Sequence, residues 1–452
     1  MKDKIAENFL YHIWDEQHLK KELHTCDGKE LKILYQGKWN TDAGPDFHNA
    51  IILLDYEKMQ GDVEIHRYEY DWHNHNHHED PNYNNVILHV VFEKNSQTLF
   101  TISESGMKIP ILILKDNLDE SIEKLWKKYG EKPFDKLQKD SITCLLTESN
   151  LSNEEILNIL LKLGRKRFER KCKRFSAELY NSDFNQILYE GILEALGYAK
   201  NKIPFLKLSK LFTYQKLQGF SKICKSPVDL FCILTIVSGM EIEDYNFNFI
   251  DENVLDSFIS IKKLVYQQIN NNLMSKNEWN FFRIRPQNHP LCRLWQISPF
   301  LFSSLEVNLI NKIISIFSIK KDTEIKPKNI QDKFFKLLNG NSNNLKYGIG
   351  KSRCDDILAN IVLPVCHIYA DTLNYDELKN TIEIIYLSSP KLSENYITKF
   401  VSARLQNKIK NSREINLPIQ QGMLQLYYQF CNYHDCKNCI RNLVDSTLKN
   451  TD

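Results

Sequence analysis

The amino-acid sequence predicts an α+β protein, in which a small mixed β-sheet domain is followed by a large all-α domain. In the first quarter of the chain, apolar and polar residues alternate or form short β-branched runs such as VILHVVF at residues 86–92, which are typical of strands. From about residue 116 onward, apolar residues recur at helical spacing instead. At 452 residues the chain is long enough for two or more domains. We therefore expect an α/β domain over residues 1–115, a helical domain over 116–430, and a cysteine cluster at the C-terminal end over 431–440.

The first domain is expected to begin with a helix and to continue as a sheet. Ile5, Phe9 and Ile13 recur at steps of four, which favours an amphipathic helix over residues 3–23. Glu7 lies on this helix and is expected to face solvent. The run at 86–92 is apolar enough for a central strand. Strands are expected at residues 31–35, 48–56, 61–68, 86–92, 98–103 and 108–114.

A hairpin of two of these strands carries the residues most suited to chemistry. Its first strand begins near Asp46, after a Gly-Pro pair, and its second is GDVEIHRY at residues 61–68. Side chains alternate along a strand, so Asp62, Glu64 and His66 share one face. The hairpin brings Asp46 near Glu64 and His66. Two carboxylates beside an imidazole can hold a hard divalent cation, Mg²⁺ or Mn²⁺, and activate a water molecule.

Histidines are concentrated in the same part of the chain, because ten of the thirteen lie in its first 89 residues. The densest stretch is DWHNHNHHED at residues 71–80, and neutral imidazole is a common ligand of zinc and other transition metals. His75 and His78 are spaced for one face of a short helix, and so are His73 and His77. A polar loop with incidental metal affinity is the alternative interpretation.

One more histidine, His89, lies within the apolar strand at 86–92. It is either a hydrogen-bonded core residue or a further ligand, and the neighbouring carboxylates make the second role chemically reasonable. The candidate metal ligands of this region are Asp46, Asp62, Glu64, His66, His75, His77, His78, Asp80 and His89.

The helical region opens with a long basic helix. Ser152 and Glu155 form a capping box at its start, and its apolar stripe runs from Ile156 to Leu179. The opposite face is basic, and Glu169 is the only acid between residues 156 and 176. Such a face is an electrostatic footprint for phosphate backbones, although a solvated helix face is the commoner alternative. The candidate nucleic-acid contacts are Lys162, Lys166, Arg170 and Lys173.

An aromatic and basic segment, WNFFRIR, follows at residues 279–285. Aromatic rings interleaved with arginines can stack nucleobases and hold phosphates. Equally, the rings can be core anchors while the two arginines pair with carboxylates.

The chain has eleven cysteines, most of them single and inside apolar runs, which is typical of buried reduced thiols. The exception is the group Cys431-x4-Cys436-x2-Cys439. Three thiols at this spacing favour zinc or an iron–sulfur cluster. The fourth ligand is left open between His434 and Cys26. The alternative is a helix end with incidental thiols.

Pro45-Asp46 followed by Glu64-x-His66 resembles the Pro-Asp…(Asp/Glu)-x-Lys pattern of the restriction-endonuclease-like PD-(D/E)XK nuclease superfamily. In that superfamily the two acidic residues hold Mg²⁺, and the lysine assists the attacking water. The resemblance implies a restriction-endonuclease-like fold for the first domain, catalytic roles for Asp46 and Glu64, and His66 in place of the lysine. A helix, a strand and then a carboxylate-bearing hairpin is the order that the nuclease core needs. In that superfamily an acidic residue on the first helix sometimes joins the site, which is the alternative role of Glu7. Some members carry an iron–sulfur cluster with one distant cysteine and a late group of three.

A second resemblance covers nearly the whole chain. The run GPDFHNAIILL…GDVEIH…DWHNHNHHEDPNYNNVILHVV, together with GYAKNK, RIRPQNHP and the late cysteines, is similar to an uncharacterised bacterial family, domain of unknown function 2851. This resemblance implies a family but no chemistry.

Composition limits the setting in which the protein works. A net charge of +2 gives no whole-molecule attraction to nucleic acid, so any basic site must be local. No run of about 18 apolar residues exists, and the N-terminus lacks an apolar signal core. We therefore expect a cytoplasmic protein without a membrane span.

Three functions remain open at this point. The first is a metal-dependent nuclease that hydrolyses phosphodiester bonds in DNA or RNA. The second is a non-catalytic adaptor that binds nucleic acid or protein on a decayed nuclease core, which the missing lysine favours. The third is a zinc-dependent hydrolase that acts on a small molecule through the histidines.

Overall fold

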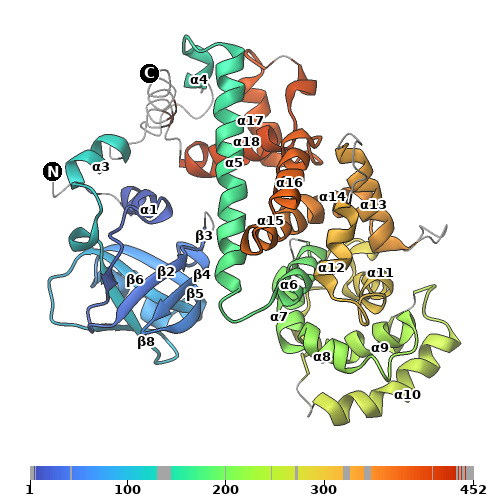
Figure 1. Cartoon of the computed structure of the whole chain (residues 1–452). Helices are drawn as coiled ribbons and strands as arrows, with labels where there is room; N and C mark the ends of the chain where they lie inside the picture. The colour runs from blue at the N-terminus through green and yellow to red at the C-terminus, as the bar shows by residue number, and fades with distance from the viewer. Residues whose placement is uncertain are drawn as a thin grey trace. The chain divides into compact units, whose positions relative to one another are not determined.

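The computed structural model describes residue 5 and residues 7–40, 43–129, 144–198, 200–245, 247–269, 273–318, 326–340, 348–409 and 411–433, with single positions at 436, 439 and 443. The chain forms two compact units (Figure 1). Unit 1 combines Met1–Asn181 with Glu394–Asp452, and unit 2 is Ser182–Ser393. The predicted boundary at residue 115 marks where the sheet gives way to helices, whereas the compact units are divided at residues 181 and 393.

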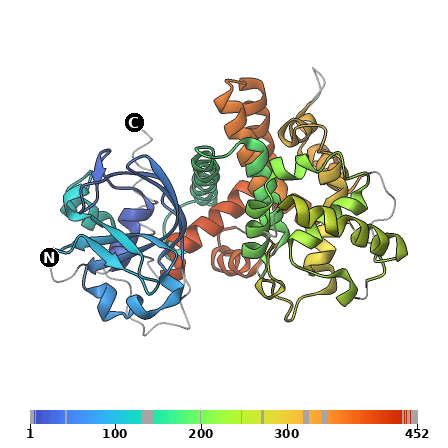
Figure 2. The same cartoon turned by 90° about the horizontal axis from the view of Figure 1, so that it is seen from below.

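Unit 1 contains the predicted mixed sheet, which is strongly curved (Figures 1 and 2). The strand order is β1-β2-β4-β5-β6-β8-β7, with β3 paired to β4. Pairing is antiparallel from β1 to β5, parallel between β5, β6 and β8, and antiparallel again between β7 and β8. The strands are β1 (Leu23–His24), β2 (Glu30–Tyr35), β3 (Lys38–Trp39), β4 (Phe47–Leu54), β5 (Glu57–Tyr68), β6 (Val86–Glu93), β7 (Phe100–Ile102) and β8 (Lys108–Ile113).

The hairpin of β4 and β5 turns earlier than the sequence predicts. Leu54 pairs with Glu57, so Asp55 and Tyr56 form the turn. Both have positive φ, 47° and 71° respectively, which is the backbone of a tight two-residue hairpin turn. The polar stretch that precedes Gly61 is therefore part of β5, because it lies in the ladder and needs no apolar side chains there.

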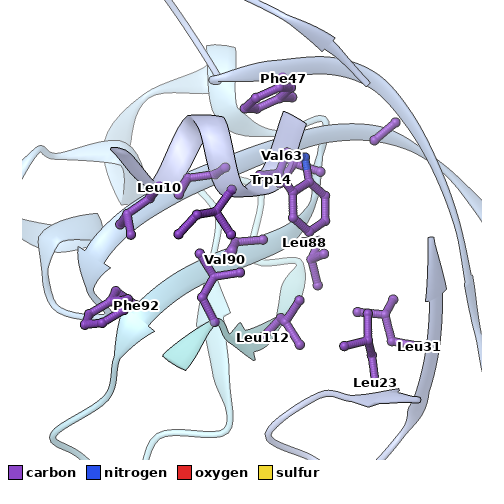
Figure 3. Close-up of a cluster of buried hydrophobic side chains, with 14 of the residues drawn as sticks. Leu10, Trp14, Leu23, Leu31, Phe47, Val63, Leu88, Val90, Phe92 and Leu112 are labelled. Carbon is purple, nitrogen blue, oxygen red and sulfur yellow. The ribbon is translucent and has the colours of Figure 1, made fainter. Parts of the chain in front are cut away.

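The core of the sheet region lies between α1 (Glu7–Asp15) and one face of the sheet. Figure 3 shows Leu10 and Trp14 of α1 against Val90 and Leu112, and all of these side chains are fully buried. The helix is shorter than the predicted range 3–23, because it ends at Asp15 and is followed by Gln17 with φ of 57°. The short elements that follow in unit 1 are α2 (Asp71–Asn74), η2 (His77–Glu79), η3 (Pro81–Tyr83), η4 (Lys115–Asn117), α3 (Ile122–Tyr129) and α4 (Leu145–Glu148).

Two long-range partners complete unit 1. Helix α5 (Asn153–Glu178) begins with the predicted capping box of Ser152 and Glu155. It packs against α18 (Leu417–Gln429) from the far end of the chain, and their apolar side chains form one buried cluster. The remaining elements of this part are α17 (Tyr396–Leu405), η11 (Ser412–Glu414) and η12 (Cys431–Tyr433).

The named secondary-structure elements in the described residues of unit 2 are all helices. Helix α9 (Pro227–Val237) is buried over its last eight residues, which accounts for the apolar run that begins after Ser226. Among the described helices of the whole chain, none is both long enough and apolar enough to cross a membrane. The other elements are α6 (Phe184–Leu196), α7 (Lys202–Leu211), α8 (Tyr214–Gly219), η5 (Ile242–Asp244), α10 (Glu252–Ile269), η6 (Lys276–Glu278), η7 (Pro286–Asn288), α11 (Pro290–Phe302), α12 (Leu309–Ile314), η8 (Ser315–Phe317), α13 (Pro327–Asn339), α14 (Lys351–Ile357), the π-helical η10 (Leu358–Val362), α15 (Leu363–Thr372) and α16 (Asp376–Ser388).

Candidate metal centre

Strand β5 divides its side chains between the core and the candidate site. Val63 and Ile65 lie in the cluster beneath α1, while Glu64 and His66 lie on the opposite face and are also buried. Asp46, just before β4, joins them as the hairpin predicts. Its N–H donates to Glu64 Oε2 at 3.0 Å, and its own Oδ2 accepts from the N–H of Ile65 at 2.8 Å. Backbone bonds therefore hold the two carboxylates side by side.

Helix α1 contributes two further residues, Tyr11, which the sequence did not single out, and Glu7, for which a solvent-facing position was favoured. Tyr11 is an electrostatic neighbour of the carboxyl groups of Asp46 and Glu7, which both raise the pKa of its hydroxyl after the larger effect of burial. Glu7, expected to face solvent, is half-buried and interacts electrostatically with His75 and His77. The expectation that Glu7 faces solvent was wrong. Helical spacing assigns Glu7 to the polar face of the helix, but it does not show that this face lies against the histidine segment.

The histidine segment is folded differently from the single helix that its spacing predicts. Helix α2 stops at Asn74, and Asn76 has φ of 60°, so the chain reverses before η2 begins at His77. This turn brings His75 and His77 together with His66, and one ring nitrogen from each lies within 4.8 Å of the others. His78 instead packs against His73, with ring centroids 4.4 Å apart, and lies outside the group.

The spacing of the nitrogen and oxygen atoms fits a transition-metal ion. His66 Nε2 lies 3.2 Å from His75 Nδ1. Glu64 Oε1 lies 3.4 Å from His66 Nε2 and 3.2 Å from His77 Nε2. Ligand atoms about 2.0 Å from a tetrahedral zinc ion are separated from one another by about 3.3 Å. The Glu64 oxygen is therefore at ligand spacing from His66 and His77, although neither Glu64 nor Asp46 belongs to the group of three histidines whose ligand atoms all lie within 4.8 Å of one another.

A buried chain of hydrogen bonds lies behind His66. Its Nδ1 is 2.9 Å from His89 Nε2, and His89 Nδ1 is 2.7 Å from the hydroxyl oxygen of Thr101. His89 was a candidate ligand, but both of its ring nitrogens are engaged in this chain. When His66 Nδ1 donates to His89, the lone pair of His66 Nε2 is left facing His75 and Glu64. Hydrogen-bond partners placed behind the ring in this way, here His89 and then Thr101, fix the orientation of a metal-binding histidine.

Two other candidate ligands are engaged elsewhere. Asp62 Oδ1 accepts from the N–H of Asn49 at 2.9 Å and lies 3.3 Å from His48 Nδ1. Asp80 accepts from the N–H of Asn82 at 2.9 Å and caps η3. Neither belongs to the histidine group.

The electrostatics of the centre favour binding of a cation. Burial, reinforced by the Glu7 and Asp62 carboxylates, raises the pKa of Glu64 to about 8, although the N–H of Asp46 opposes this shift. Burial, followed by the charge of Glu64, also raises the pKa of Asp46 well above its usual range. The charged groups that act most strongly on both carboxyls are other carboxyls, and neither a lysine nor an arginine is among them.

The imidazoles show the opposite shifts. Burial, together with the neighbouring histidines, lowers the pKa of His66, and burial also lowers that of His77. His66 and His77 are therefore neutral near pH 7 and present nitrogen lone pairs. A cluster of carboxyl groups that repel one another, beside neutral imidazoles, is the environment that a divalent cation neutralises.

The predicted nucleic-acid face of α5 is partly occupied by contacts within unit 1. Arg170 pairs with Asp15 at 2.8 Å and with Glu16 at 3.1 Å, and Lys166 also pairs with Glu16. These two basic residues therefore attach α5 to the end of α1. Lys162 and Lys173 are exposed.

The late cysteines gather at the end of the α5–α18 core. Cys439 is buried in that cluster, and Cys431 and Cys144 pack against it. Burial, followed by Cys144 and Cys436, raises the pKa of Cys431 to about 12. Cys26 lies apart in the sheet region, where its N–H donates to Ile111, so Cys144 is the distant cysteine near this group.

The geometry of these thiols is looser than that of the histidines. His434 lies outside the described residues. In the part of the chain that the structure describes, only His66, His75 and His77 bring three ligand atoms close enough to share one ion.

Comparison with known proteins identifies the family of the chain but adds no chemistry. No curated protein and no solved structure matches it. The sequence profile of one family matches residues 7–415, which is most of the chain. The chain therefore belongs to the family described as "Protein of unknown function (DUF2851)".

Proposed function

We propose that the protein is a metal-dependent hydrolase of phosphodiester bonds in nucleic acid. Its centre consists of Asp46 and Glu64 together with His66, His75 and His77. One observation carries the proposal. Two buried carboxyl groups lie beside neutral imidazoles at ligand spacing, and no lysine or arginine is among the charged groups that act most strongly on these carboxyls. Groups of this kind are stable together when a cation lies between them.

The donor set favours Mn²⁺ or Zn²⁺ over Mg²⁺. Imidazole nitrogens suit zinc and other transition metals, whereas Mg²⁺ prefers oxygen ligands and retains its waters. A centre built from carboxylates alone would have favoured Mg²⁺. The three histidines shift this expectation toward Mn²⁺ or Zn²⁺.

The order of the elements supports the nuclease class among metal hydrolases. Helix α1 is followed by β2, β4 and β5 as an antiparallel succession, and β6 then lies parallel to β5. Pro45-Asp46 comes at the start of β4, and Glu64-x-His66 lies on β5. These are the positions that the resembled restriction-endonuclease-like core requires of its acidic residues.

The residues of the chain have distinct expected roles. A divalent cation bound here would polarise a water molecule and offset the charge of the scissile phosphate. Glu64 and His66, held on a rigid strand, position that charge, and His89 orients the His66 ring through its Nε2. The N–H of Asp46 bonds to Glu64 and the N–H of Ile65 bonds to Asp46, so the two carboxyl groups are kept side by side.

The test is cleavage of labelled single- and double-stranded DNA and RNA with Mg²⁺, Mn²⁺ or Zn²⁺. We expect cutting by the wild type, best with Mn²⁺ or Zn²⁺, and its loss in Asp46→Asn and Glu64→Gln. Glu79→Gln is the matched control, because Glu79 lies in the same histidine segment but its side chain is 73% exposed. Equal activity in Glu64→Gln and Glu79→Gln would contradict the proposed centre.

A second candidate is a zinc-dependent hydrolase acting on a small molecule, which the three-imidazole group favours. Measuring the metal content together with cleavage distinguishes this candidate from the nuclease. His75→Ala and His77→Ala should release the ion, whereas His73→Ala, outside the group, should retain it. Stoichiometric zinc in a protein that neither cuts nor binds nucleic acid would support this candidate. Nucleic-acid binding without cleavage under any metal would instead support the adaptor.

A further inference from the structure

Unit 2 contains a polar and aromatic groove that the proposed centre does not use. Its volume is about 620 Å³, and it lies between the start of α7 and the segment 277–282. This is where two stretches of the sequence, GYAKNK and WNFFRIR, come together. Its lining includes Lys200, Lys207, Glu278, Trp279, Asn280 and Phe282.

An aromatic ring projects beside this groove from a firmly held segment. Phe282 is 69% exposed, which is unusual for a phenylalanine. Its N–H donates to the Asn280 side chain at 3.0 Å, and its carbonyl accepts from Lys200 Nζ at 2.6 Å. Asn280 is itself tied to Asn201 by two bonds, from the Asn280 N–H at 2.8 Å and to the Asn280 carbonyl at 2.9 Å. The exposure of the ring is therefore built into the segment.

The base of the segment is anchored in the core. Trp279 is buried and its indole N–H donates to the carbonyl of Ser238 at 2.8 Å. Trp279 is therefore a core anchor, whereas Phe282 faces solvent. The alternative in which all rings of WNFFRIR are core anchors does not describe Phe282.

Positive charge surrounds the exposed ring. Lys200 and Arg283 lie over it, 5.7 and 4.9 Å from its centroid. Lys202, Arg283 and Arg285 are exposed. Within the described residues, none of these four basic side chains forms an ion pair, whereas Lys207 of the groove pairs with Glu278.

We propose that this groove binds single-stranded nucleic acid, with a base stacked on Phe282 and phosphates held by Lys200 and Arg283. This inference rests on the proposed function and names residues of unit 2 that would bind the same substrate. A base can stack on an exposed ring only when it is not already stacked within a duplex, so single strands are the expected class. Cations alone would accept any anion, and it is the ring that selects a nucleobase.

The test is binding of a fluorescent single-stranded oligonucleotide to the full chain, measured by anisotropy in EDTA. Phe282→Ala should weaken binding roughly 5- to 150-fold, and Phe282→Trp should retain it, because stacking contributes about 1–3 kcal/mol per base. Tyr375→Ala is the matched aromatic control, since Tyr375 is also an exposed ring of unit 2 (48%). It should bind like the wild type.

Charge is tested separately through the dependence on salt. The double variant Lys200→Gln and Arg283→Gln should lower the slope of log K against log salt by about 0.7 for each lost phosphate contact. Lys263→Gln, an exposed lysine on α10, should leave the slope unchanged. A matched duplex should compete poorly, and so should polyglutamate.

The outcomes separate this inference from the proposed function. Cleavage with metal but unchanged binding in Phe282→Ala overturns the groove and leaves the centre intact. Binding that depends on Phe282, without cleavage under any metal, supports the groove and contradicts the hydrolase. Competition by polyglutamate as strong as that by single strands, with no effect of Phe282→Ala, overturns the groove as a nucleic-acid site.

Discussion

A lysine at position 66 would place a permanent positive charge beside Glu64, whereas the buried imidazole found there supplies a neutral nitrogen. His66 therefore cannot neutralise the carboxyl pair by itself. It can act only as a ligand or as a proton carrier, and its Nδ1 is already engaged with His89. At the scale of the residue, a histidine at the position of the pattern's lysine would make the proposed centre depend more strongly on a bound cation.

The orientation of His66 gives the first prediction. His89→Leu removes the acceptor at His66 Nδ1, so the ring loses the partner that directs Nε2 toward the other donors. We expect the affinity for Zn²⁺, measured by competition with a chromophoric chelator, to fall about 10- to 100-fold. His89→Gln restores an amide partner and should lose less. Wild-type affinity for Zn²⁺ in a correctly folded His89→Leu protein would show that the hydrogen bond between His66 and His89 does not orient the His66 ring.

His12 gives a prediction about pH. Burial lowers its pKa from the usual 6.5 to about 4, with Arg170 and Lys166 adding to the shift and Glu16 opposing it. The unfolded chain therefore binds a proton at His12 below about pH 6.5, while the folded chain does not until about pH 4. Unfolding is thus favoured as pH falls through this window, by about 2 to 3 kcal/mol at pH 4.5.

The comparison that isolates His12 uses a variant that keeps its packing. His12 lies against Trp39 and Phe430, so His12→Phe should fit the same aromatic contacts. Urea unfolding at pH 7 and pH 4.5 should show a smaller loss of stability in the variant than in the wild type. An equal loss in both proteins would mean that other groups account for the acid sensitivity.

At the scale of the element, the approach of α5 to α18 depends on two glycines. A Cβ atom on Gly164 would lie 1.9 Å from the carbonyl oxygen of Pro418, and one on Gly422 would lie 1.9 Å from that of Leu160. Both obstacles are backbone atoms, so the helices must separate to accept a methyl group. Gly164→Ala is therefore expected to destabilise unit 1 by about 1–3 kcal/mol or more.

Thermal unfolding of Gly164→Ala and Gly219→Ala tests this expectation. Gly219 ends helix α8, and a Cβ atom there has no neighbour within 4 Å. We expect a lower Tm for Gly164→Ala and an unchanged or slightly higher Tm for Gly219→Ala, because alanine restricts the unfolded chain. Similar Tm values in the two variants would contradict close packing of α5 on α18.

The strands were predictable from the sequence because their signal is local. Alternation along β5 assigns Glu64 and His66 to one face, and the ladder of β4 and β5 then brings Asp46 beside them. The histidine group was not predictable from spacing, because a single left-handed residue, Asn76, replaces the helical pairing by one between His75 and His77. Asparagine is among the few residues that adopt this conformation readily, so it was the one available signal.

At the scale of the whole molecule, distance along the chain sets the limit of sequence reasoning. The packing of α5 on α18, and of Cys144 and Cys431 on one apolar cluster, joins segments that precede and follow unit 2 along the chain. No local periodicity shows which distant helix covers which stripe. The basic face of α5 was visible in the sequence, but the carboxylates of Asp15 and Glu16 that meet Lys166 and Arg170 were not.

The division into units leads to the last prediction. The fragment 182–393 is a continuous segment with buried helices of its own, such as α9, and it is within the usual size of a domain. We expect it to fold alone and to unfold in one cooperative thermal transition.

The fragment 116–430, which has the bounds of the predicted helical domain, retains α5 and α18 but lacks α1. Lys166 and Arg170 would then lose Asp15 and Glu16, and the apolar cluster of unit 1 would lose its continuation at Cys439 and Leu443. This fragment should therefore aggregate or unfold at a lower temperature. Cooperative unfolding of 116–430, with 182–393 unstructured, would show that the helices form one cooperative domain as the sequence pattern predicts.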